Sequence, residues 1–505
     1  MSDKFCINRR SFIGSMMAVG AAATVSNPVA LAAGEECPHT QYGPVTIPEK
    51  DKDTSEFLAE YITNLSYDDL STDVVEAAKR RMLDSMGCAI AAIDEPEISI
   101  IRKSILSMKK GPCSIIGSRL YASPPEAALL NTGMVRVLDY NDTYVGPHGG
   151  GHPSNSIAAV MGCTEFVGGS TKNMLTAIVI CYEILGAFAD ILNTRAHGMD
   201  HLGYVGISLC SAMGKALELT PEQLQNALGI MVSTYNPLHV TLAEQITMWK
   251  GIATAYGAMN AVHASQLGKN GMIGPRKPFD GHTGWKEVVA RRDFELNLTP
   301  GERIHNIWTK LYLSETYALS AAEGMIEFSQ KHDIDPGQIK SIHVQSFGNA
   351  VSRIGATEGR NPYHVTSKPE ADHSFPYIIS VSLLDKELTH AQYEQKRIMK
   401  NDVQDLLKKV TVEENPEFSR QFVSGTSPVP AEIDITMKDG RTYKIRKNYF
   451  SGHAKDPATM EQVIDKFYYL TENKIDSKRS EKIIDTVNNI ESHKIKDLTR
   501  LLQIT

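Results

Sequence analysis

The chain is organised around one segment, Arg136-Val-Leu-Asp139-Tyr-Asn-Asp142-Thr143-Tyr-Val-Gly-Pro-His148-Gly-Gly-Gly-His152-Pro153. It combines two carboxylates, two imidazoles and three hydroxyls with six glycines or prolines. The apolar stretches on either side of it, 127–138 and 157–167, are predicted to be helices. A polar loop held between two rigid elements is a common setting for an active site, so we expect functional residues here.

Three other interpretations of this loop remain open from the residues alone. Two histidines spaced H-x3-H form a metal site when they share one face of a helix, but the three glycines between His148 and His152 disfavour a helix. A glycine-rich loop can also bind phosphate at the start of a helix, but neither the P-loop nor the dinucleotide-binding spacing of glycines is present. A solvated turn without function is the third alternative. The leading interpretation is an acid/base site, in which a histidine titrates near neutral pH and Asp139 orients it or shares its proton.

Length and charge bound the class of protein. With 505 residues the chain is too long for one ordinary core, so two domains are expected. The formal net charge of -7 is modest and the basic residues are scattered, which argues against nucleic acid as a partner. The composition is that of a soluble globular protein.

The N-terminal residues differ from the rest of the chain. Arg9-Arg10 precedes an apolar, alanine-rich run, and Ala30-Leu31-Ala32 offers a small-residue cleavage site. We predict a twin-arginine signal peptide over 1–33 and a polar linker over 34–53. The mature protein is then expected in the periplasm or at the exterior of a prokaryotic cell, with no membrane contact after cleavage. An uncleaved amphipathic anchor is the alternative.

The cysteines indicate neither a metal site nor a cluster. None of the seven forms a C-x2-C pair, so no zinc knuckle or iron–sulfur run is visible. Cys88, Cys163, Cys181 and Cys210 lie in apolar helical stretches, where small buried thiols are expected. No metal and no cofactor are predicted.

Residues 54–305 are predicted to form a large all-α helical domain. Within it, 171–185 is apolar on nearly all sides and is expected to be a central, buried helix. Glu183 inside this helix needs a partner, and a structural hydrogen bond is favoured over a catalytic role. Thr220-Pro221-Glu222-Gln223 is a capping box with proline at the first helical position, which predicts the start of another helix.

The pattern changes after Asn306, where residues begin to alternate as in strands. The alternating stretches are 342–345, 410–412, 433–437 and 442–445. Asp439-Gly440 between the last two predicts a hairpin. We therefore predict a smaller α+β lid domain over 306–447 and a return to the helical domain over 448–505, in a fold that is mainly α.

Several motifs in the same order resemble the MmgE/PrpD family, which includes 2-methylcitrate dehydratase and cis-aconitate decarboxylase. The matching stretches are Arg81-Met-Leu-Asp84-Ser-Met-Gly87-Cys88, the loop 139–153, Asp200-His201, Trp249-Lys250-Gly251, Lys310, Asp372-His373-Ser-Phe-Pro-Tyr377 with Leu383-Leu384-Asp385, and Gly452-His453-Ala-Lys-Asp456-Pro457. They span most of the mature chain. The resemblance implies a helical domain with a mixed α+β lid, usually as a homodimer, and the small-residue run 251–264 is a candidate for close helix contact in it.

The resemblance also implies which residues line a pocket between the helical domain and the lid. They are Asp139, Thr143, His152, His201, Lys250, Lys310 and Tyr377. Two departures stand out. Members of the family commonly place a histidine several residues after Lys310, whereas this chain has Ser314-Glu315-Thr316-Tyr317. The loop also carries a glycine-rich insertion over 145–151, so His148 has no clear counterpart.

The chemistry of a bound di- or tricarboxylate assigns roles to these residues. Such an anion needs cations, which Lys250, Lys310 and charged histidines would supply. Removing a proton next to a carboxylate builds enolate-like charge, which the same cations stabilise. A base must take the carbon-bound proton while an acid protonates the departing hydroxyl. We assign one proton transfer to His152 together with Asp139, and the other to His201.

Thr143 and Tyr377 are assigned as hydrogen-bond donors to the substrate. The leading prediction is a metal-independent lyase that dehydrates a hydroxy di- or tricarboxylic acid. The alternatives are a decarboxylase of a cis-aconitate-like acid, an isomerase or epimerase that uses the same pocket, and a periplasmic polycarboxylate-binding protein without catalysis. The missing histidine after Lys310 favours the last of these, and the export signal indicates an unusual external acid as the substrate.

Overall fold

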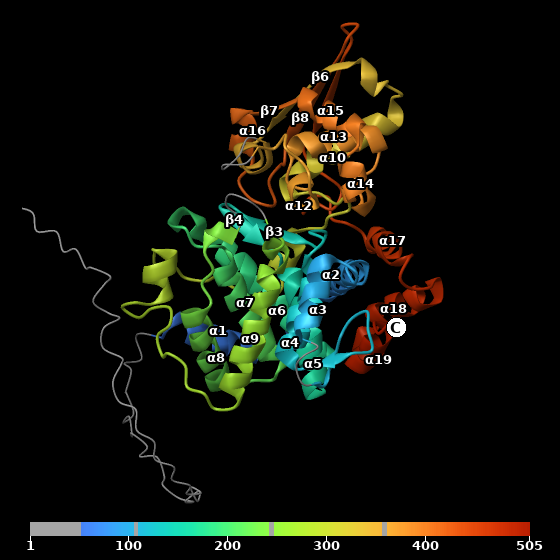
Figure 1. The fold of residues 1–505 in the computed structure, drawn as a ribbon. Helices are drawn as coiled ribbons and strands as arrows, with labels where there is room; N and C mark the ends of the chain where they lie inside the picture. Colours follow the sequence, from blue (N-terminus) through green and yellow to red (C-terminus); the bar gives the residue numbers. More distant parts are fainter. Residues whose placement is uncertain (1–51, 106–109, 242–246, 356–360, 505) are drawn as a thin grey trace, which may run out of the picture. The chain divides into compact units, whose positions relative to one another are not determined.

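A computed structural model describes residues 52–105, 110–241, 247–355 and 361–504. These residues form a mainly helical structure with a few small sheets, as predicted (Figure 1). The predicted signal peptide over 1–33 lies outside the described residues, as does the predicted linker up to residue 51. The predicted division into a helical domain and a lid stays a prediction.

The first part of the described chain is a succession of helices. They are α1 (Thr54–Asn64), α2 (Thr72–Ala91), α3 (Pro96–Ile105), α4 (Pro124–Arg136), α5 (Ile157–Val167), α6 (Thr171–Ile191), α7 (Leu202–Ala216), α8 (Pro221–Thr234) and α9 (Trp249–Lys269). Thr220 caps α8 through the predicted capping box, with Pro221 at its start. Helix α9 packs against α4, α7 and α8, and α6 packs against α2, α5 and α7.

Helix α6 is the buried centre of this group. Among the described residues it is the one helix long and apolar enough to cross a membrane. Its most apolar 18 residues, however, are 89% buried inside the protein. Glu183 within it is fully buried and accepts hydrogen bonds from the backbone N–H groups of Thr299 and Arg303, at 2.9 and 3.2 Å. The predictions of a central core helix and of a structural partner for Glu183 are therefore confirmed.

A four-stranded sheet follows in the sequence, with the strand order β7-β6-β8-β9. Its strands are β6 (Ile339–Ser346), β7 (Val410–Glu414), β8 (Ala431–Met437) and β9 (Thr442–Lys447). Strands β6 and β7 are parallel, and the other pairs are antiparallel. Gly440 adopts φ +91° in the turn between β8 and β9, so the predicted hairpin is confirmed. Two helices, α10 (Leu319–Lys331) and α13 (Phe375–Asp385), pack against the sheet.

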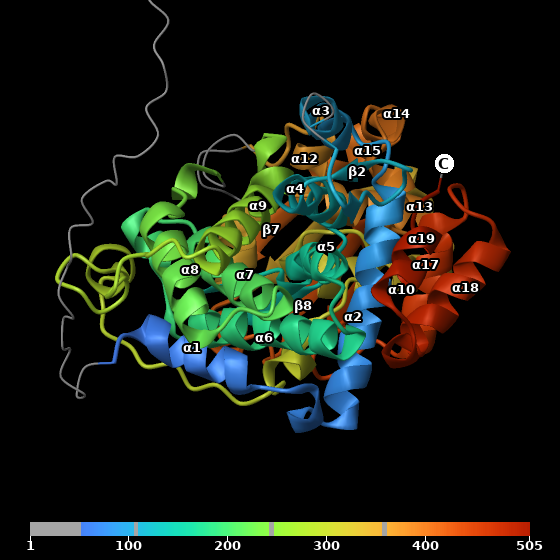
Figure 2. The same cartoon turned by 90° about the horizontal axis from the view of Figure 1, so that it is seen from below.

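Short helices connect these elements, and three helices end the chain. The short ones are α11 (Gly348–Ala350), α12 (Lys368–Ala371), α14 (Gln395–Ile398), α15 (Asn401–Leu406) and α16 (Pro416–Gln421), and the last three are α17 (Met460–Thr471), α18 (Ser477–Asn488) and α19 (Ile495–Leu501). Helix α17 lies along α2 (Figure 2). Lys466 on α17 places its Nζ 2.6 Å from Oδ1 of Asp84 on α2, and both side chains are buried.

The segment predicted as a loop between two helices contains two short strands. These are β3 (Thr143–Gly146) and β4 (Gly149–Gly151), which pair with each other, and β3 also pairs with β5 (Ile307–Trp308). A Cβ atom added to Gly150 would lie 1.8 Å from the carbonyl oxygen of Tyr144, so only glycine permits this approach. The glycines that suggested a loop therefore allow a tight strand pair. The remaining sheet pairs β1 (Cys113–Ser114) with β2 (Tyr121–Ala122).

The five described cysteines are free, buried thiols, which confirms the expectation for four of them. They are Cys88, Cys113, Cys163, Cys181 and Cys210. Burial raises the pKa of Cys88, Cys181 and Cys210 to about 12. Cys6 and Cys37 lie outside the described residues.

Candidate active site

Asp139 holds three cations together at the end of α4. Its φ of +56° is unusual for a residue other than glycine and places its carboxylate 2.7 Å from Nη1 of Arg136. Lys250, in the first turn of α9, lies 2.7 Å from Oδ2 of Asp139. Lys310 follows β5 and donates to the backbone oxygen of Asp139 at 2.8 Å and to Oδ1 at 3.2 Å. The pairing of β3 with β5 brings Lys310 to this point.

The cations determine the charge of Asp139. Burial alone would raise the pKa of its carboxyl, but the positive charges of Arg136, Lys250 and Lys310 outweigh burial and hold that pKa well below its usual range. Asp139 is therefore ionised at neutral pH, and the group as a whole is positive. This arrangement suits an anion-binding site and makes Asp139 an organiser of cations.

His152 is a neutral imidazole with a defined proton. Its Nδ1 lies 2.6 Å from the carbonyl oxygen of Asp142, which can only accept, so Nδ1 carries the hydrogen and Nε2 keeps its lone pair. Oγ1 of Thr143 is 3.1 Å from the same nitrogen. Burial lowers the pKa of His152 well below its usual value, and the charge of Arg136 adds to the effect. A buried imidazole with a bare nitrogen is suited to act as a base.

His152 and Asp139 make their hydrogen bonds to different partners, and their assignment as one proton-transfer unit stays a prediction. The hydrogen bonds of the Asp139 carboxylate go to Arg136, Lys250 and Lys310, whereas His152 is held by Asp142 and Thr143. Asp139 acts on His152 through its charge, which opposes the lowering of the histidine pKa. The reason is that three cations surround the carboxylate and take up its acceptor positions.

Two further histidines are each backed by the aspartate that precedes them. Nδ1 of His201 lies 2.5 Å from Oδ1 of Asp200, at the start of α7. Nδ1 of His373 contacts Oδ1 of Asp372 in the same way, just before α13. Burial lowers the pKa of both histidines, and the neighbouring aspartate opposes that effect in each case. His373 was quoted only as part of a motif, although the repeated Asp-His pair was a signal for it.

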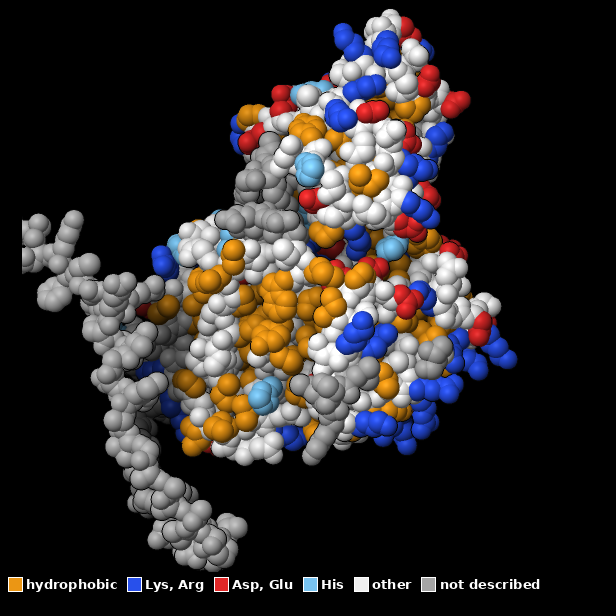
Figure 3. Space-filling model, viewed as in Figure 1, with side chains coloured by type: hydrophobic (Ala, Val, Ile, Leu, Met, Phe, Trp, Pro, Cys, Tyr) orange, Lys and Arg blue, Asp and Glu red, His pale blue; other side chains and the backbone are white. Residues whose placement is uncertain are grey.

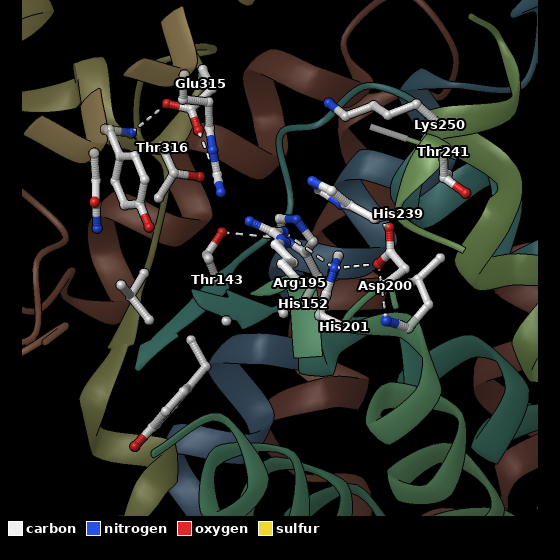
Figure 4. Close-up of a pocket in the computed structure, with 18 of the residues that line it drawn as sticks. Thr143, His152, Arg195, Asp200, His201, His239, Thr241, Lys250, Glu315 and Thr316 are labelled. Atoms are coloured by element: carbon white, nitrogen blue, oxygen red, sulfur yellow. Dashed lines mark hydrogen bonds and ion pairs between the residues drawn. The ribbon is translucent and has the colours of Figure 1, made fainter. Parts of the chain in front are cut away.

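These side chains line one pocket of about 610 Å³, a size typical of small-molecule sites. Its wall includes Arg136, Asp139, Thr143, His148, His152, Arg195, Asp200, His201, His239, Lys250, Glu315, Arg353 and His373. Figure 4 shows Glu315 and Thr316 on one side and Lys250 on the other, with His152 and His201 between them. The structure therefore brings together five of the seven predicted residues.

Lys310 and Tyr377 do not line this pocket. Lys310 is fully buried, and its Nζ donates hydrogen bonds to the backbone oxygen and the carboxylate of Asp139. Tyr377 lies in the first turn of α13, is fully buried, and donates its hydroxyl hydrogen to the carbonyl oxygen of Gln392. Their assignment as substrate-binding residues stays a prediction, which this geometry does not support. Within the Asp372-to-Tyr377 motif, His373 is the residue that faces the pocket.

Glu315 lies on the pocket wall near the place of the missing family histidine. Its Oε2 accepts a hydrogen bond from the N–H of Tyr317 at 2.6 Å, and its Oε1 lies 3.8 Å from Nη1 of Arg353. The chain thus has a carboxylate and a guanidinium in this region of the pocket. Sequence reasoning missed Arg136, Arg195 and Arg353, because an arginine in a loop or at a helix end is usually on the surface.

Among the described side chains, no group of three histidines, cysteines, aspartates or glutamates is placed to hold a metal ion. Metal independence stays a prediction. What the pocket does offer is a cluster of cations around Asp139 and three imidazoles whose Nδ1 is engaged by an acceptor. This arrangement can bind carboxylates and move protons at nearby carbon and oxygen atoms.

Comparison with known proteins agrees with this chemistry. The MmgE/PrpD N-terminal domain matches residues 56–297, and the MmgE/PrpD C-terminal domain matches residues 312–492. A 2-methylcitrate dehydratase-like protein of Aspergillus oryzae is 25% identical, over 81% of this chain and 87% of its own length. Mouse cis-aconitate decarboxylase is 25% identical, over 90% of this chain and 94% of its own.

The 2-methylcitrate dehydratase of Salmonella typhimurium is 22% identical, over 85% of this chain and 92% of its own length. By their names these relatives are dehydratases and a decarboxylase, which supports a lyase activity at the level of the family. With both family domains matched in order, the chain belongs to the MmgE/PrpD family.

Proposed function

We propose that this chain is a lyase that dehydrates a hydroxy di- or tricarboxylic acid by histidine acid/base chemistry without a metal. The observation that carries the proposal is the meeting of His152, His201 and Lys250 on one pocket wall. Lys250 would bind the carboxylate next to the reacting carbon. As the proton leaves that carbon, negative charge builds on this carboxylate, and the cations around Asp139 stabilise it.

The different partners of the histidines separate their roles. A bound polycarboxylate adds negative charge to the pocket and so raises the pKa of nearby histidines. Nδ1 of His201 contacts the carboxylate of Asp200, which stabilises an imidazolium, whereas Nδ1 of His152 contacts the uncharged carbonyl of Asp142 and hydroxyl of Thr143. We therefore assign His152 as the base that takes the carbon-bound proton and His201 as the acid that protonates the leaving hydroxyl. His373, backed by Asp372, is the second candidate for the acid.

Decarboxylation of an unsaturated polycarboxylate is the second candidate function. Mouse cis-aconitate decarboxylase covers 90% of this chain, and loss of carbon dioxide also builds charge that the cations would stabilise. The test is to incubate the purified protein with a panel of hydroxy and unsaturated di- and tricarboxylic acids and to identify the products by NMR. An unsaturated acid formed with loss of water supports the dehydratase. Carbon dioxide as a product supports the decarboxylase instead. Binding of an acid without turnover supports a binding protein without catalysis.

We further propose that the protein is exported by the twin-arginine route and acts in the periplasm or at the cell exterior. The support is in Arg9-Arg10 and the small-residue site at Ala30-Leu31-Ala32, which lie outside the described residues. Replacing both arginines by lysine should keep the protein in the cytoplasm. Unchanged export of that variant would refute the route.

We also propose that the protein acts as a homodimer through its helical part. Figure 3 shows hydrophobic side chains gathered on the face over α4 and α9. On α9, Trp249 and Tyr256 are 47% and 43% exposed, and their ring centroids are 5.8 Å apart. Large exposed aromatic side chains next to apolar neighbours are typical of protein interfaces. A second copy of the chain is the expected partner.

A further inference from the structure

Two arginines line the pocket in addition to the cations around Asp139. Arg195 belongs to a short 3-10 helix, Thr194–His197, and Arg353 to a single π-helical turn, Val351–Gly355. Although they are far apart in the sequence, both line the same cavity. Burial lowers the pKa of Arg195, and the charge of Arg353 lowers it further, because the two positive guanidinium groups repel each other. Two like charges at a partly buried site favour the binding of an anion that can contact both.

The Nε and Nη2 donors of Arg195 have no suitable acceptor among the residues that the structure describes. Its Nη2 lies 3.2 Å from Nδ1 of His201, but that nitrogen already donates its hydrogen to Asp200 at 2.5 Å and cannot also accept one. Its Nε is buried without a hydrogen-bond partner among the described residues. A buried donor left without an acceptor costs free energy, and a ligand oxygen would relieve that cost.

Arg353 is oriented by two neighbours. Its guanidinium carbon lies 5.1 Å from the centroid of the Tyr317 ring, a cation–π distance. Its Nη1 lies 3.8 Å from Oε1 of Glu315, too far for a hydrogen bond although close enough for partial charge compensation. Glu315 is itself fixed by the N–H of Tyr317. The guanidinium plane is therefore held in place before a ligand arrives.

We propose that Arg195 and Arg353 form a second carboxylate subsite, which binds a substrate carboxylate remote from the one held at Lys250. This inference rests on the proposed function and narrows it, because the substrate must carry at least two carboxylates separated by the reacting carbons. The planar donor pattern of arginine fits the two oxygens of a carboxylate better than a lysine would. Glu315 then disfavours a ligand with further negative charge at this end of the pocket.

The test uses three saturated acids that cannot be dehydrated: butyrate with one carboxylate, glutarate with two, and tricarballylate with three. Their dissociation constants are measured by isothermal titration calorimetry on the whole protein. The variants are Arg195→Gln and Arg353→Gln, with Arg353→Lys to keep the positive charge but remove the planar set of donors. Arg420→Gln is the matched control, because Arg420 is exposed and pairs with Glu417 away from the pocket. Circular dichroism checks that each variant is folded.

The unchanged protein is expected to bind glutarate and tricarballylate more tightly than butyrate. Each glutamine variant should weaken glutarate and tricarballylate on the order of 10-fold or more, the usual size of a lost charged hydrogen bond, and leave butyrate nearly unchanged. Arg353→Lys should fall in between, and Arg420→Gln should match the unchanged protein. Should Arg195→Gln fail to fold, Arg353→Gln and Arg353→Lys alone test whether the second carboxylate subsite exists.

Equal weakening of all three acids by the arginine variants would overturn the subsite, as would equal affinity of the unchanged protein for butyrate and tricarballylate. Because the probes do not react, these outcomes are independent of turnover. Discrimination among the probes by a protein that converts no acid would overturn the lyase and keep the subsite. A protein that converts an acid but binds the three probes equally would keep the lyase and overturn the subsite.

Discussion

Oδ2 of Asp139 lies 2.7 Å from Nζ of Lys250, although the two residues are 111 positions apart in the sequence. Asp139 sits in a left-handed backbone conformation after α4, and Lys250 sits in the first turn of α9. Because Arg136 and Lys310 bind the same carboxylate, one anion sets the positions of three cations. The substrate carboxylate is then expected to meet a prearranged positive site, which needs no reorganisation during the reaction.

Asp139→Asn should therefore damage both stability and activity. The variant leaves three partly buried cations without their anion, and breaking such a network costs about 3–5 kcal/mol. We expect the free energy of unfolding to fall by that amount and kcat/KM to fall at least 100-fold, since Lys250 loses its position. Urea unfolding and steady-state kinetics measure the two effects.

Asp385→Asn is the matched control for this change. Asp385 pairs with Arg397 at 2.7 Å outside the pocket, so its loss should lower stability and leave kcat/KM unchanged. An Asp139→Asn protein with unchanged kinetics would show that the cation cluster has no part in the reaction.

The assigned proton transfers predict the effects of the histidine variants. His152→Gln and His201→Gln should each lower kcat on the order of 100-fold or more and change KM little, as expected for a general base or acid. His282→Gln, at an exposed position, is the control. A His201→Gln variant with full activity would move the acid role to His373, and two fully active variants would refute the assignment.

The pocket histidines also predict how stability depends on pH. Burial lowers the pKa of His152, His201 and His373, so as the pH falls the unfolded chain takes up protons at about 6.5, before the folded protein does. Their contribution to stability is present above that pH and is lost as the pH falls through it. Asp139 and Asp200 have pKa values lowered in the folded state, so their contribution is lost only below about pH 4. Between pH 7 and 5 these histidines should therefore lower the free energy of unfolding as the pH falls.

His453 adds to this effect outside the pocket. It is fully buried beside the Trp308 ring, and burial lowers its pKa to about 4. This shift alone removes about 1 kcal/mol of stability between pH 7.5 and 5.5. Urea unfolding at these two pH values should show a clear loss, and His152→Gln should make the loss smaller. The slope of His282→Gln should match the unchanged protein, and stability that is independent of pH in this range would contradict the expected neutral, buried state.

The helices and strands could be predicted mostly from local sequence patterns, whereas the pocket depends on contacts between residues that are distant in the sequence. The burial of α6 and the hairpin at Asp439-Gly440 follow from periodicity and turn chemistry within a few residues. The strands β3 and β4 were missed, because three glycines resemble a loop when the carbonyl of Tyr144 beside them is not visible.

The residues of the site were found only in part for the same reason. The loop chemistry singled out Asp139 and His152, and the resemblance added His201 and Lys250. Nothing in the local sequence around Arg195 or Arg353 distinguishes a pocket arginine from a surface arginine. Which side chain of the motif 372–377 faces the pocket depends on where α13 begins: Ser374 caps that helix, and Tyr377 then donates to Gln392 in the interior.

Tyr377→Phe tests whether the tyrosine hydroxyl binds the substrate. The change removes a buried hydrogen bond and leaves the carbonyl group of Gln392 unpaired, which should lower the free energy of unfolding by about 1–3 kcal/mol. The KM for the substrate should not change, because the hydroxyl does not reach the pocket. Thr143→Val, on the pocket wall beside His152, should instead alter the kinetics. A large rise in KM for Tyr377→Phe would return this tyrosine to the binding site.

The apolar face on α9 leads to the last prediction, which concerns the proposed homodimer. Tyr256 is 43% exposed on this helix, so Tyr256→Glu would place a charge against the apolar surface of a second copy. Light scattering after gel filtration at micromolar concentration should show a dimer for the unchanged protein and a monomer for the variant. Tyr469→Glu, on α17 with a similar exposure of 39%, is the control and should stay dimeric. Because Lys250 lies in the first turn of α9, the monomer should also show a higher KM. A monomeric unchanged protein, or a Tyr256→Glu dimer of undiminished stability, would place the interface elsewhere or remove it.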